Sequence, residues 1–203
     1  MSIPFQDSET AKNLLRAFAG ESQARNRYDF AANLCQKQEL QAMAFIFQAT
    51  AKQEQAHAKV FWDHLQALNG QNLPIYGAYP IEGTNRILEL LRAAQHNEHE
   101  EHGSVYPSFA AIATQEGFPE AAASFRQIAA IEQLHGERFG LLADQLESGT
   151  LFVSQIETGW MCLNCGHTQN SLEAPKQCPV CNHGQGWFIR LELAPWSPVV
   201  KQI

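Results

Sequence analysis

Two Glu-x-x-His sequences pair residue types that bind metal ions at a spacing that suits a helix. They are Glu54-x-x-His57 and Glu132-x-x-His135. Residues three apart on an α-helix project from one face, so each carboxylate and its imidazole can serve the same metal centre. A single pair of this kind occurs by chance in many helices. Two pairs predict a metal centre only if further ligands from other helices lie at the same depth.

Four of the five cysteines form a second candidate site. Cys162-x-x-Cys165 and Cys178-x-x-Cys181 are separated by twelve residues, which is typical of a tetrahedral site for zinc or a single iron. In a chain expected to be cytosolic, such clustering indicates a metal site rather than disulfides. The motif alone favours zinc. A neighbouring redox centre would favour iron, because iron in four thiolates can pass one electron and zinc has no accessible redox change.

Helix-forming composition, interrupted by turn residues, predicts the elements that would position these ligands. The expected helices span about 8–35, 39–68, 84–116 and 119–147. Asp7 or Ser8 would cap the first helix and Thr84 the third, which Pro107 would kink. Gly, Pro and aromatic residues after about 150 predict short strands and turns. We therefore expect a mainly α fold, with a four-helix bundle over 1–150 and a small β module over 151–203.

Alternating steps of four and three residues trace the side chains that would face the bundle core. Each of the four seams is apolar at both ends and ionisable in the middle. The ionisable positions are Glu21 and Arg25, then Glu54 and His57, then Glu98 and Glu101, and finally Glu132 and His135. A lone seam glutamate is ordinarily a surface residue or a satisfied buried group. Agreement among four helices instead predicts that five carboxylates and two imidazoles meet at one level of the core.

Burial of five carboxylates requires cations, because a single unpaired buried carboxylate already costs several kcal/mol. Arg25 is the only basic seam residue and cannot balance them. Two iron ions would nearly neutralise the set in either redox state. In ferritin-like carboxylate proteins, two helices each give one Glu and the other two each give Glu-x-x-His. Glu21 and Glu98 would be the single carboxylates here. Glu101 is one more than that set needs, so it could let an iron change ligands when its charge changes.

These residues together resemble the rubrerythrin family over nearly the whole chain. The resemblance is carried by residues 20–28 (GESQARNRY), by both Glu-x-x-His motifs, and by Glu98-x-x-Glu101 followed by residues 106–110 (YPSFA). The segment from Cys162 to Cys181 is similar to a rubredoxin. The resemblance implies a ferritin-like di-iron bundle with a rubredoxin-like module. It also implies a homodimer and a peroxidase that reduces hydrogen peroxide to water in defence against oxidative stress.

The resemblance implies a role for each ligand of the iron pair. Glu54 and Glu132 would bridge the two irons. Glu21 would end on one iron, and Glu98 and His135 on the other. These roles come from the family pattern and not from the spacing of the residues.

Further roles implied by the resemblance concern ligand exchange and hydrogen bonding. Glu101 and His57 would exchange as ligands of one iron. Tyr28 and Tyr106 would donate hydrogen bonds to the carboxylates, with ordinary core tyrosines as the alternative. His167 departs from the pattern, because rubredoxins usually have Tyr there, and this could alter the potential of the sulfur-bound iron. We expect three further histidines to lie outside the ligand set: His96, His99 and His102.

Charge and composition exclude several classes of partner. The formal net charge is -7, with a pI near 5.6, which gives no attraction to nucleic acid or to anionic membrane surfaces. No stretch approaches the roughly 20 apolar residues of a membrane span, and no secretory signal opens the chain. We therefore predict a cytoplasmic protein. The chain also lacks a Gly-rich dinucleotide fingerprint, so a separate NAD(P)H-dependent reductase would supply its electrons.

Two other functions remain open at this point. A ferroxidase or iron-handling bundle would use the same carboxylates, although iron oxidation needs no appended electron module. A non-enzymatic zinc ribbon that recognises a partner would use only the cysteines. The stretch 148–159, if it is a linker, spans at most about 40 Å, whereas the helices are about 45 Å long. We therefore predict at least a dimer, in which electrons cross between chains.

Overall fold

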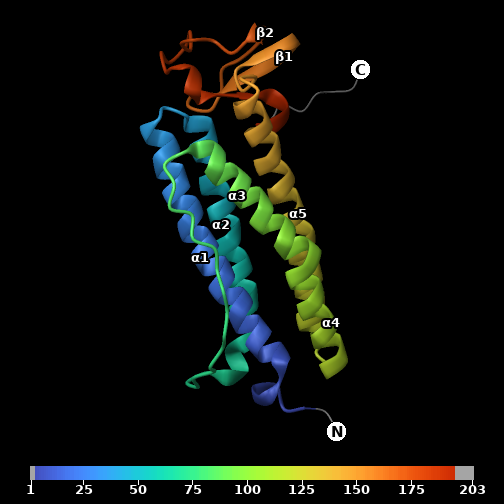
Figure 1. Cartoon of the computed structure of the whole chain (residues 1–203). Helices are drawn as coiled ribbons and strands as arrows, with labels where there is room; N and C mark the ends of the chain where they lie inside the picture. The colour runs from blue at the N-terminus through green and yellow to red at the C-terminus, as the bar shows by residue number, and fades with distance from the viewer. Residues whose placement is uncertain (1–2, 195–203) are drawn as a thin grey trace.

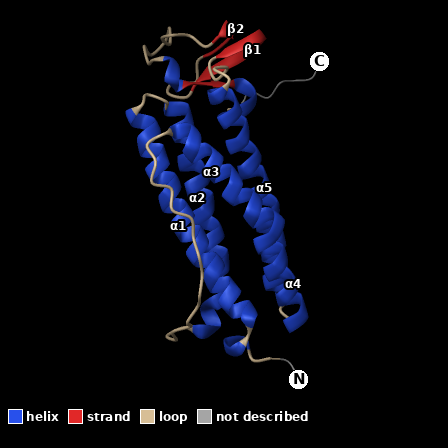
Figure 2. Ribbon diagram, in the orientation of Figure 1, coloured by secondary structure: helices blue, strands red, loops and turns tan. Residues whose placement is uncertain are grey.

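The computed structural model describes residues 3–194 and confirms the predicted fold class. A long helical bundle carries a small three-stranded sheet at one end (Figure 1, Figure 2). The α-helices are α1 Glu9–Lys37, α2 Gln41–His64, α3 Ile87–Glu100, α4 Tyr106–Glu116 and α5 Pro119–Glu147. The strands are β1 Val153–Cys162, β2 Thr168–Glu173 and β3 Phe188–Arg190. A π-helical turn, Glu101–Val105, joins α3 to α4, so these two helices form one rod of the bundle.

The helix ends agree with the turn chemistry of the sequence at most positions. The Ser8 hydroxyl accepts a hydrogen bond from the Ala11 N–H at 3.1 Å, which confirms the predicted cap of α1. Gly117 has φ 86°, the left-handed conformation that suits a helix C-terminus. Thr84 was predicted to cap the third helix, and this is wrong. Its hydroxyl accepts from the Arg86 N–H at 3.2 Å in the turn that precedes α3.

The third predicted helix is interrupted, but not at Pro107 itself. Regular α-helical hydrogen bonding stops at Glu100, and the π turn Glu101–Val105 intervenes before α4 begins at Tyr106. Proline lacks an N–H and is tolerated in the first turn of a helix, where its donor is not needed. The wider π turn therefore ends one α-helix and allows Pro107 to open the next.

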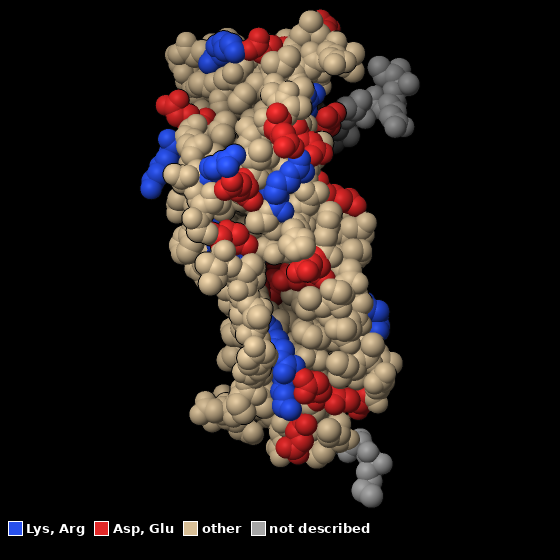
Figure 3. Space-filling view, in the orientation of Figure 1, with Lys and Arg blue, Asp and Glu red and all other residues tan. Residues whose placement is uncertain are grey.

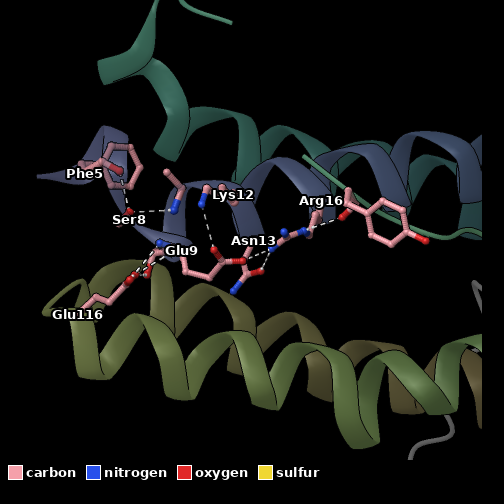
Figure 4. Close-up of polar contacts among 10 residues, drawn as sticks. Phe5, Ser8, Glu9, Lys12, Asn13, Arg16 and Glu116 are labelled. Atoms are coloured by element: carbon pink, nitrogen blue, oxygen red, sulfur yellow. Dashed lines mark hydrogen bonds and ion pairs between the residues drawn. The ribbon is translucent and has the colours of Figure 1, made fainter. Parts of the chain in front are cut away.

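A carboxylate from α4 caps the N-terminus of α1 (Figure 4). Glu116 accepts hydrogen bonds from the Glu9 N–H at 2.9 Å, the Thr10 N–H at 2.8 Å and the Thr10 hydroxyl at 2.5 Å. The first N–H groups of a helix have no partner within the helix, and they favour a negative charge. Glu116 therefore joins the ends of two helices that are far apart in sequence.

Two apolar cores lie on either side of the ionisable level, as the seams predict. One contains Tyr28, Phe47 and Phe139 and continues toward the sheet. The other contains Phe61 and Phe125 and fills the opposite half of the bundle. Between them lie buried Glu and His side chains that are at most 6% exposed. The bundle is thus divided into two apolar halves by one charged layer.

The prediction that Arg25 lies in the core seam is wrong. Arg25 is exposed, and Ala24 occupies the buried position at 3% exposure. Glu21 and Tyr28 are both buried as predicted, but the buried face passes between them by a step of three and then four, so Ala24 and not Arg25 faces the core. The charged layer therefore contains no arginine from this position, and its need for cations is greater than the sequence suggested.

The sheet has the order β2-β1-β3 with antiparallel pairing, and it packs on the end of its own bundle. Met161 and Ile189 belong to the same apolar core as the upper bundle. A Cβ atom on Gly186 would lie 1.7 Å from the Glu39 carbonyl oxygen, so only glycine allows this approach. The stretch 148–159 is not the free linker that the sequence suggested, because β1 begins at Val153. The division into domains 1–150 and 151–203 stays a prediction.

The described surface carries both signs of charge. Figure 3 shows acidic and basic side chains interspersed on one face of the molecule. No helix within residues 3–194 is both long enough and apolar enough to cross a membrane. The predicted cytoplasmic location stays a prediction.

Replacement of Glu116 by Ala should lower the free energy of unfolding by about 1 kcal/mol at neutral pH, because two N–H groups lose their acceptor. Burial acts to raise the pKa of Glu116, but hydrogen bonds from Thr10 and the backbone outweigh it and lower this pKa. The pKa of Glu116 is therefore lower in the folded protein than in the unfolded chain, where it is about 4.3. The cap stabilises the fold fully above pH 4.3, and this stabilisation is lost as the pH falls through the pKa of the folded protein. Urea unfolding at fixed metal content should show the difference at pH 7 and a smaller one near pH 3.

The exposed Glu157 offers the matched control for this experiment. Glu157→Ala should leave the midpoint of unfolding nearly unchanged at either pH. An equal loss of stability in both variants would show that Glu116 is not a cap of α1.

Candidate metal centres

The two Glu-x-x-His motifs face each other across the bundle from α2 and α5. The rings of His57 and His135 are stacked, with centroids 5.8 Å apart. His57 Nδ1 lies 2.9 Å from Glu132 Oε1 and 3.1 Å from Glu54 Oε2. His135 Nδ1 lies 2.8 Å from Glu132 Oε2 and 3.1 Å from Glu54 Oε1. Each of the two carboxylates therefore turns one oxygen toward each imidazole.

Two groups of metal donors share these carboxylates. The His57 group consists of Glu21, Glu54, His57 and Glu132, and the His135 group consists of Glu54, Glu98, Glu132 and His135. Within each group the donor atoms lie within 4.8 Å of one another. Glu21 Oε2 is 3.7 Å from His57 Nδ1, and Glu98 Oε2 is 3.8 Å from His135 Nδ1. Two adjacent metal ions with Glu54 and Glu132 between them would satisfy this arrangement.

Apart from the close contacts between carboxylates and imidazoles given above, several buried donor atoms have no hydrogen-bond partner, and this tests whether metal ions fit. The atoms without a partner include Glu21 Oε2, Glu54 Oε1, Glu98 Oε2, both carboxylate oxygens of Glu132, and His135 Nδ1. Buried polar atoms of a folded protein are nearly always paired, and leaving them unpaired costs free energy. Carboxylate and imidazole donors suit iron and similar divalent metals. The residues present therefore fit a pair of metal ions.

Two tyrosines hold the outer carboxylates. The Tyr28 hydroxyl donates a hydrogen bond to Glu98 Oε1, and the Tyr106 hydroxyl donates one to Glu21 Oε1. Each carboxylate thus gives one oxygen to a tyrosine and presents the other, Oε2, to the metal donors. Burial and nearby carboxylates raise the pKa of both tyrosines well above the usual range, so the hydroxyls remain donors. This arrangement favours the predicted orienting role over that of ordinary core tyrosines.

The π turn places Tyr106 at the same distance along its helix from Glu98 as Tyr28 is from Glu21. Glu21 and Tyr28 are seven residues apart on α1, which is two turns of a regular helix. Glu98 and Tyr106 are eight residues apart, and the π turn between them absorbs the additional residue. The difference between seven and eight was visible in the sequence, but its meaning depends on a hydrogen-bond pattern that only the structure shows.

Glu101 lies beside the two donor groups and not within them. It opens the π turn and lines a cavity of about 260 Å³ together with Tyr106. Burial, followed by the charges of Glu98, Glu132 and Glu54, raises the pKa of Glu101 well above its usual range. The direction of this shift favours the protonated form of the Glu101 carboxyl. Its role as a ligand stays a prediction.

Gln53 is a contact that the sequence analysis missed. Its side-chain oxygen Oε1 lies 2.9 Å from His135 Nε2, which donates the hydrogen bond. This bond leaves Nδ1 of His135 free to act as a metal donor. No spacing rule distinguishes Gln53 from the other glutamines of α2. By contrast, the histidines expected outside the ligand set lie outside both donor groups: His96, His99 and His102.

The four cysteines meet at the tip of the module. Sγ of Cys162 lies 3.7 Å from that of Cys181, and Sγ of Cys165 lies 3.6 Å from that of Cys178. A metal bonded to four sulfurs at about 2.3 Å would place neighbouring sulfurs about 3.8 Å apart. A disulfide would need about 2.05 Å, so the thiols are arranged for a metal ion.

Both cysteine knuckles use the same backbone geometry. Gly166 and Asn182 each follow the second cysteine of a knuckle and have φ 76° and 61°. The turns direct backbone N–H groups at the sulfurs, and the N–H of His183 lowers the pKa of Cys181 to about 5. A lower pKa favours the thiolate of Cys181, which is the form that binds metals, whereas burial raises the pKa of Cys162 to about 12.

Comparisons with known proteins agree with this pair of sites. The family model described as Rubrerythrin matches residues 12–143, and the one described as Rubrerythrin, rubredoxin-like domain matches residues 160–189. The chain belongs to the rubrerythrin family. It is 44% identical to the rubrerythrin of Porphyromonas gingivalis, over 93% of this chain and 92% of the relative. It is 40% identical to the rubrerythrin of Nitratidesulfovibrio vulgaris, over 89% and 93%.

A solved structure of fully reduced nigerythrin has a similar fold. Its TM-score is 0.60 at 25% identity, over 91% of this chain and 90% of that one. Membership of the rubrerythrin family supports a di-iron protein of oxidative-stress defence and, more generally, an oxidoreductase. The carboxylate and histidine cluster fits a di-iron centre, and the four-cysteine site fits one iron or zinc ion. The two donor sets thus fit the predicted cofactors, which confirms this prediction.

Anaerobic loading with ferrous iron should give about three irons per chain and should release protons. Burial opposes a charge on His57, but Glu132, Glu21 and Glu54 outweigh it and raise the pKa of His57 to about 12. Because metal must displace such protons, binding at the bundle site should weaken as the pH falls. Calorimetry in buffers of different ionisation enthalpy would measure the protons released, and elemental analysis would measure the iron.

The visible spectrum separates the two sites in the same sample. Iron in four thiolates is coloured, whereas zinc is not. Zinc that persists at the cysteines under iron loading would remove the electron-transfer role of the module. Iron binding without proton release would contradict the raised pKa of His57, because it would show that no protons had to leave the site.

Proposed function

We propose that this chain is a di-iron peroxidase that reduces hydrogen peroxide to water, with electrons supplied through the four-cysteine iron. The observation that carries the proposal is the pair of donor groups that share Glu54 and Glu132 in a buried core. An iron pair supplies two one-electron changes at one place, which is the number that cleavage of the O–O bond requires. The apolar halves of the bundle exclude bulk water from that place.

The side chains around the donor groups supply position and protons. Tyr28 and Tyr106 hold the outer carboxylates through hydrogen bonds, so Glu98 and Glu21 keep their orientation. Reduction of one peroxide to two waters consumes two protons as well as two electrons. Glu101 lines the cavity beside the centre, and because burial raises the pKa of its carboxyl, this group could hold a proton and give it there.

The positions of the two side chains support the proposed exchange of ligands between His57 and Glu101. His57 lies within its donor group, whereas Glu101 lies outside both groups. An exchange would require that only one of the two side chains be a ligand at a time, and this arrangement is compatible with that. Glu101 opens a single π turn, and such turns are frequent at functional sites.

The position of the module supports transfer of electrons between chains. Gly186 of the module packs against the turn that precedes α2, next to Leu40. The fourteen residues from Leu40 to Glu54 rise about 21 Å along α2. A chain packed head-to-tail would bring its module nearer to this metal pair than the chain's own module is. A separate NAD(P)H-dependent reductase would then refill the module.

The alternative functions have less support. A ferroxidase would have no use for a four-cysteine iron site, because oxidation of iron needs no electron supply. A zinc ribbon that only recognises a partner would leave the buried carboxylates and imidazoles of the bundle without a purpose.

Glu101→Ala should slow peroxide turnover by about tenfold or more while the fold and the iron content stay the same. The reason is that the variant loses both the proposed exchange ligand and a proton donor beside the centre. Steady-state turnover with peroxide in excess would measure the effect.

Glu120 provides the control, because its side chain is exposed and does not line the cavity beside the centre. Glu120→Ala should turn over at the parental rate. Parental turnover in Glu101→Ala would remove Glu101 from the mechanism.

Mixed dimers should show whether electrons cross between chains. One chain would carry Ser in place of the four cysteines, and the other would carry Glu54→Ala and His57→Ala. If transfer crosses the interface, the hybrid should recover about the activity of one site, although each mutant alone is inactive. A hybrid as inactive as both mutants, with exchange of chains confirmed by mass spectrometry, would place the transfer within one chain.

A further inference from the structure

A long segment between α2 and α3 covers one side of the bundle. Residues 69–86, here called the strap, contain no helix or strand and run along α1 (Figure 1). None of the strap side chains is buried. A segment of this length without secondary structure is uncommon in a compact domain and is often functional. The strap therefore needs an explanation other than core packing.

Polar contacts attach the strap to the bundle on both sides of Tyr79. Arg16 Nε donates to the Tyr76 carbonyl oxygen at 2.9 Å. Arg27 Nη1 donates to both carboxylate oxygens of Glu82 at 2.8 and 2.9 Å, and Asn97 also donates to Glu82 at 2.8 Å. Since these contacts do not involve the side chain of Tyr79, its replacement should leave the strap in place.

The strap covers the cavity of about 260 Å³ described above. Residues 77–80 of the strap and Gly20 of α1 form part of its wall, and Glu101 and Tyr106 form another part. The volume has room for several water molecules. The Tyr106 hydroxyl donates a hydrogen bond to the metal donor Glu21. Only the side chain of Tyr106 therefore separates a small molecule in this cavity from Glu21.

Tyr79 joins the strap to α1 at the wall of this cavity. Its hydroxyl donates to the Arg16 carbonyl oxygen at 2.9 Å. Its ring lies against two glycines: a Cβ on Gly20 would be 3.5 Å from Tyr79 Cε1, and a Cβ on Gly77 would be 3.0 Å from the hydroxyl oxygen. The ring thus lies between the strap and α1, against these two glycines, and forms part of the wall of the cavity.

The metal donors themselves are at most 6% exposed, so a substrate needs a route to them. We propose that the cavity beneath the strap is the route by which peroxide reaches the metal pair, and that Tyr79 limits the size of the molecule that passes. This inference rests on the proposed peroxidase function. It assigns to Tyr79 a role in specificity and not in the chemical step.

The first test compares two tyrosines of the strap. Tyr79→Ala should raise the rate with tert-butyl hydroperoxide relative to hydrogen peroxide by about tenfold, because a wider opening favours the larger molecule. Tyr76→Ala is the matched control, since Tyr76 is 86% exposed and does not line the cavity. The control should leave the ratio unchanged. An unchanged ratio in Tyr79→Ala, or an equal change in both variants, would overturn the inference.

The second test measures access without turnover. Azide binding to the oxidised metal pair, followed by stopped-flow absorbance, should be slower in Gly20→Leu by about tenfold, with the same final spectrum. The added side chain would enter the space beside Tyr79, so Tyr79→Ala in the same chain should restore the rate. Azide association at the parental rate in Gly20→Leu would show that the route lies elsewhere.

The two tests separate the access route from the proposed function. If the variants alter azide association as expected but the parent reduces no peroxide, the peroxidase proposal is wrong and the route stands. If the parent reduces peroxide while the variants alter neither azide association nor the size ratio, the route is wrong and the peroxidase stands.

Discussion

The burial of one layer of carboxylates and imidazoles is the constraint on which the bundle depends. Apolar side chains above and below this layer remove it from water, so its unpaired oxygen atoms carry a large desolvation cost. Protons can offset part of this cost, and the raised pKa values of Glu21 and Glu101 show where they would reside. Metal ions can offset more of it, because each would contact several donors at once. Metal binding is therefore coupled to the stability of the fold.

Helical geometry converts this layer into two nearly equivalent halves. The outer carboxylates Glu21 and Glu98 each have a tyrosine behind them and an imidazole in front. The halves differ in the rod that contains α3 and α4, where the π turn adds one residue. Glu101 opens that turn, three residues after Glu98, and lines the cavity beside the layer, whereas Ala24 stands three residues after Glu21 on α1. The additional carboxylate therefore makes the two halves unequal, and a change of ligand would need such a difference.

The sequence predicts the parts of this structure that follow from helical periodicity. The buried levels of Glu54, His57, Glu132 and His135 were predicted from steps of three and four residues. The prediction for Arg25 is wrong because alternating steps of four and three do not fix the order of the two steps, and between Glu21 and Tyr28 the step of three comes first. The π turn and the contact of Gly186 with the α1–α2 turn were not predicted, because both depend on tertiary packing. Gln53 was missed for the same reason: its contact with His135 joins two helices that the sequence does not show to be adjacent.

A buried redox centre requires separate routes for its small substrate and for its electrons. A molecule such as peroxide needs an opening, and the cavity beneath the strap, which is lined by Glu101 and Tyr106, is the one that we propose. Electrons need proximity and not an opening, but the module is held at the end of its own bundle by a continuous apolar core. That core fixes the module in place, so it cannot swing down to its own metal pair without exposing Met161 and Ile189 to water. The cost of such exposure favours a fixed module that serves a neighbouring chain over a mobile one that serves its own.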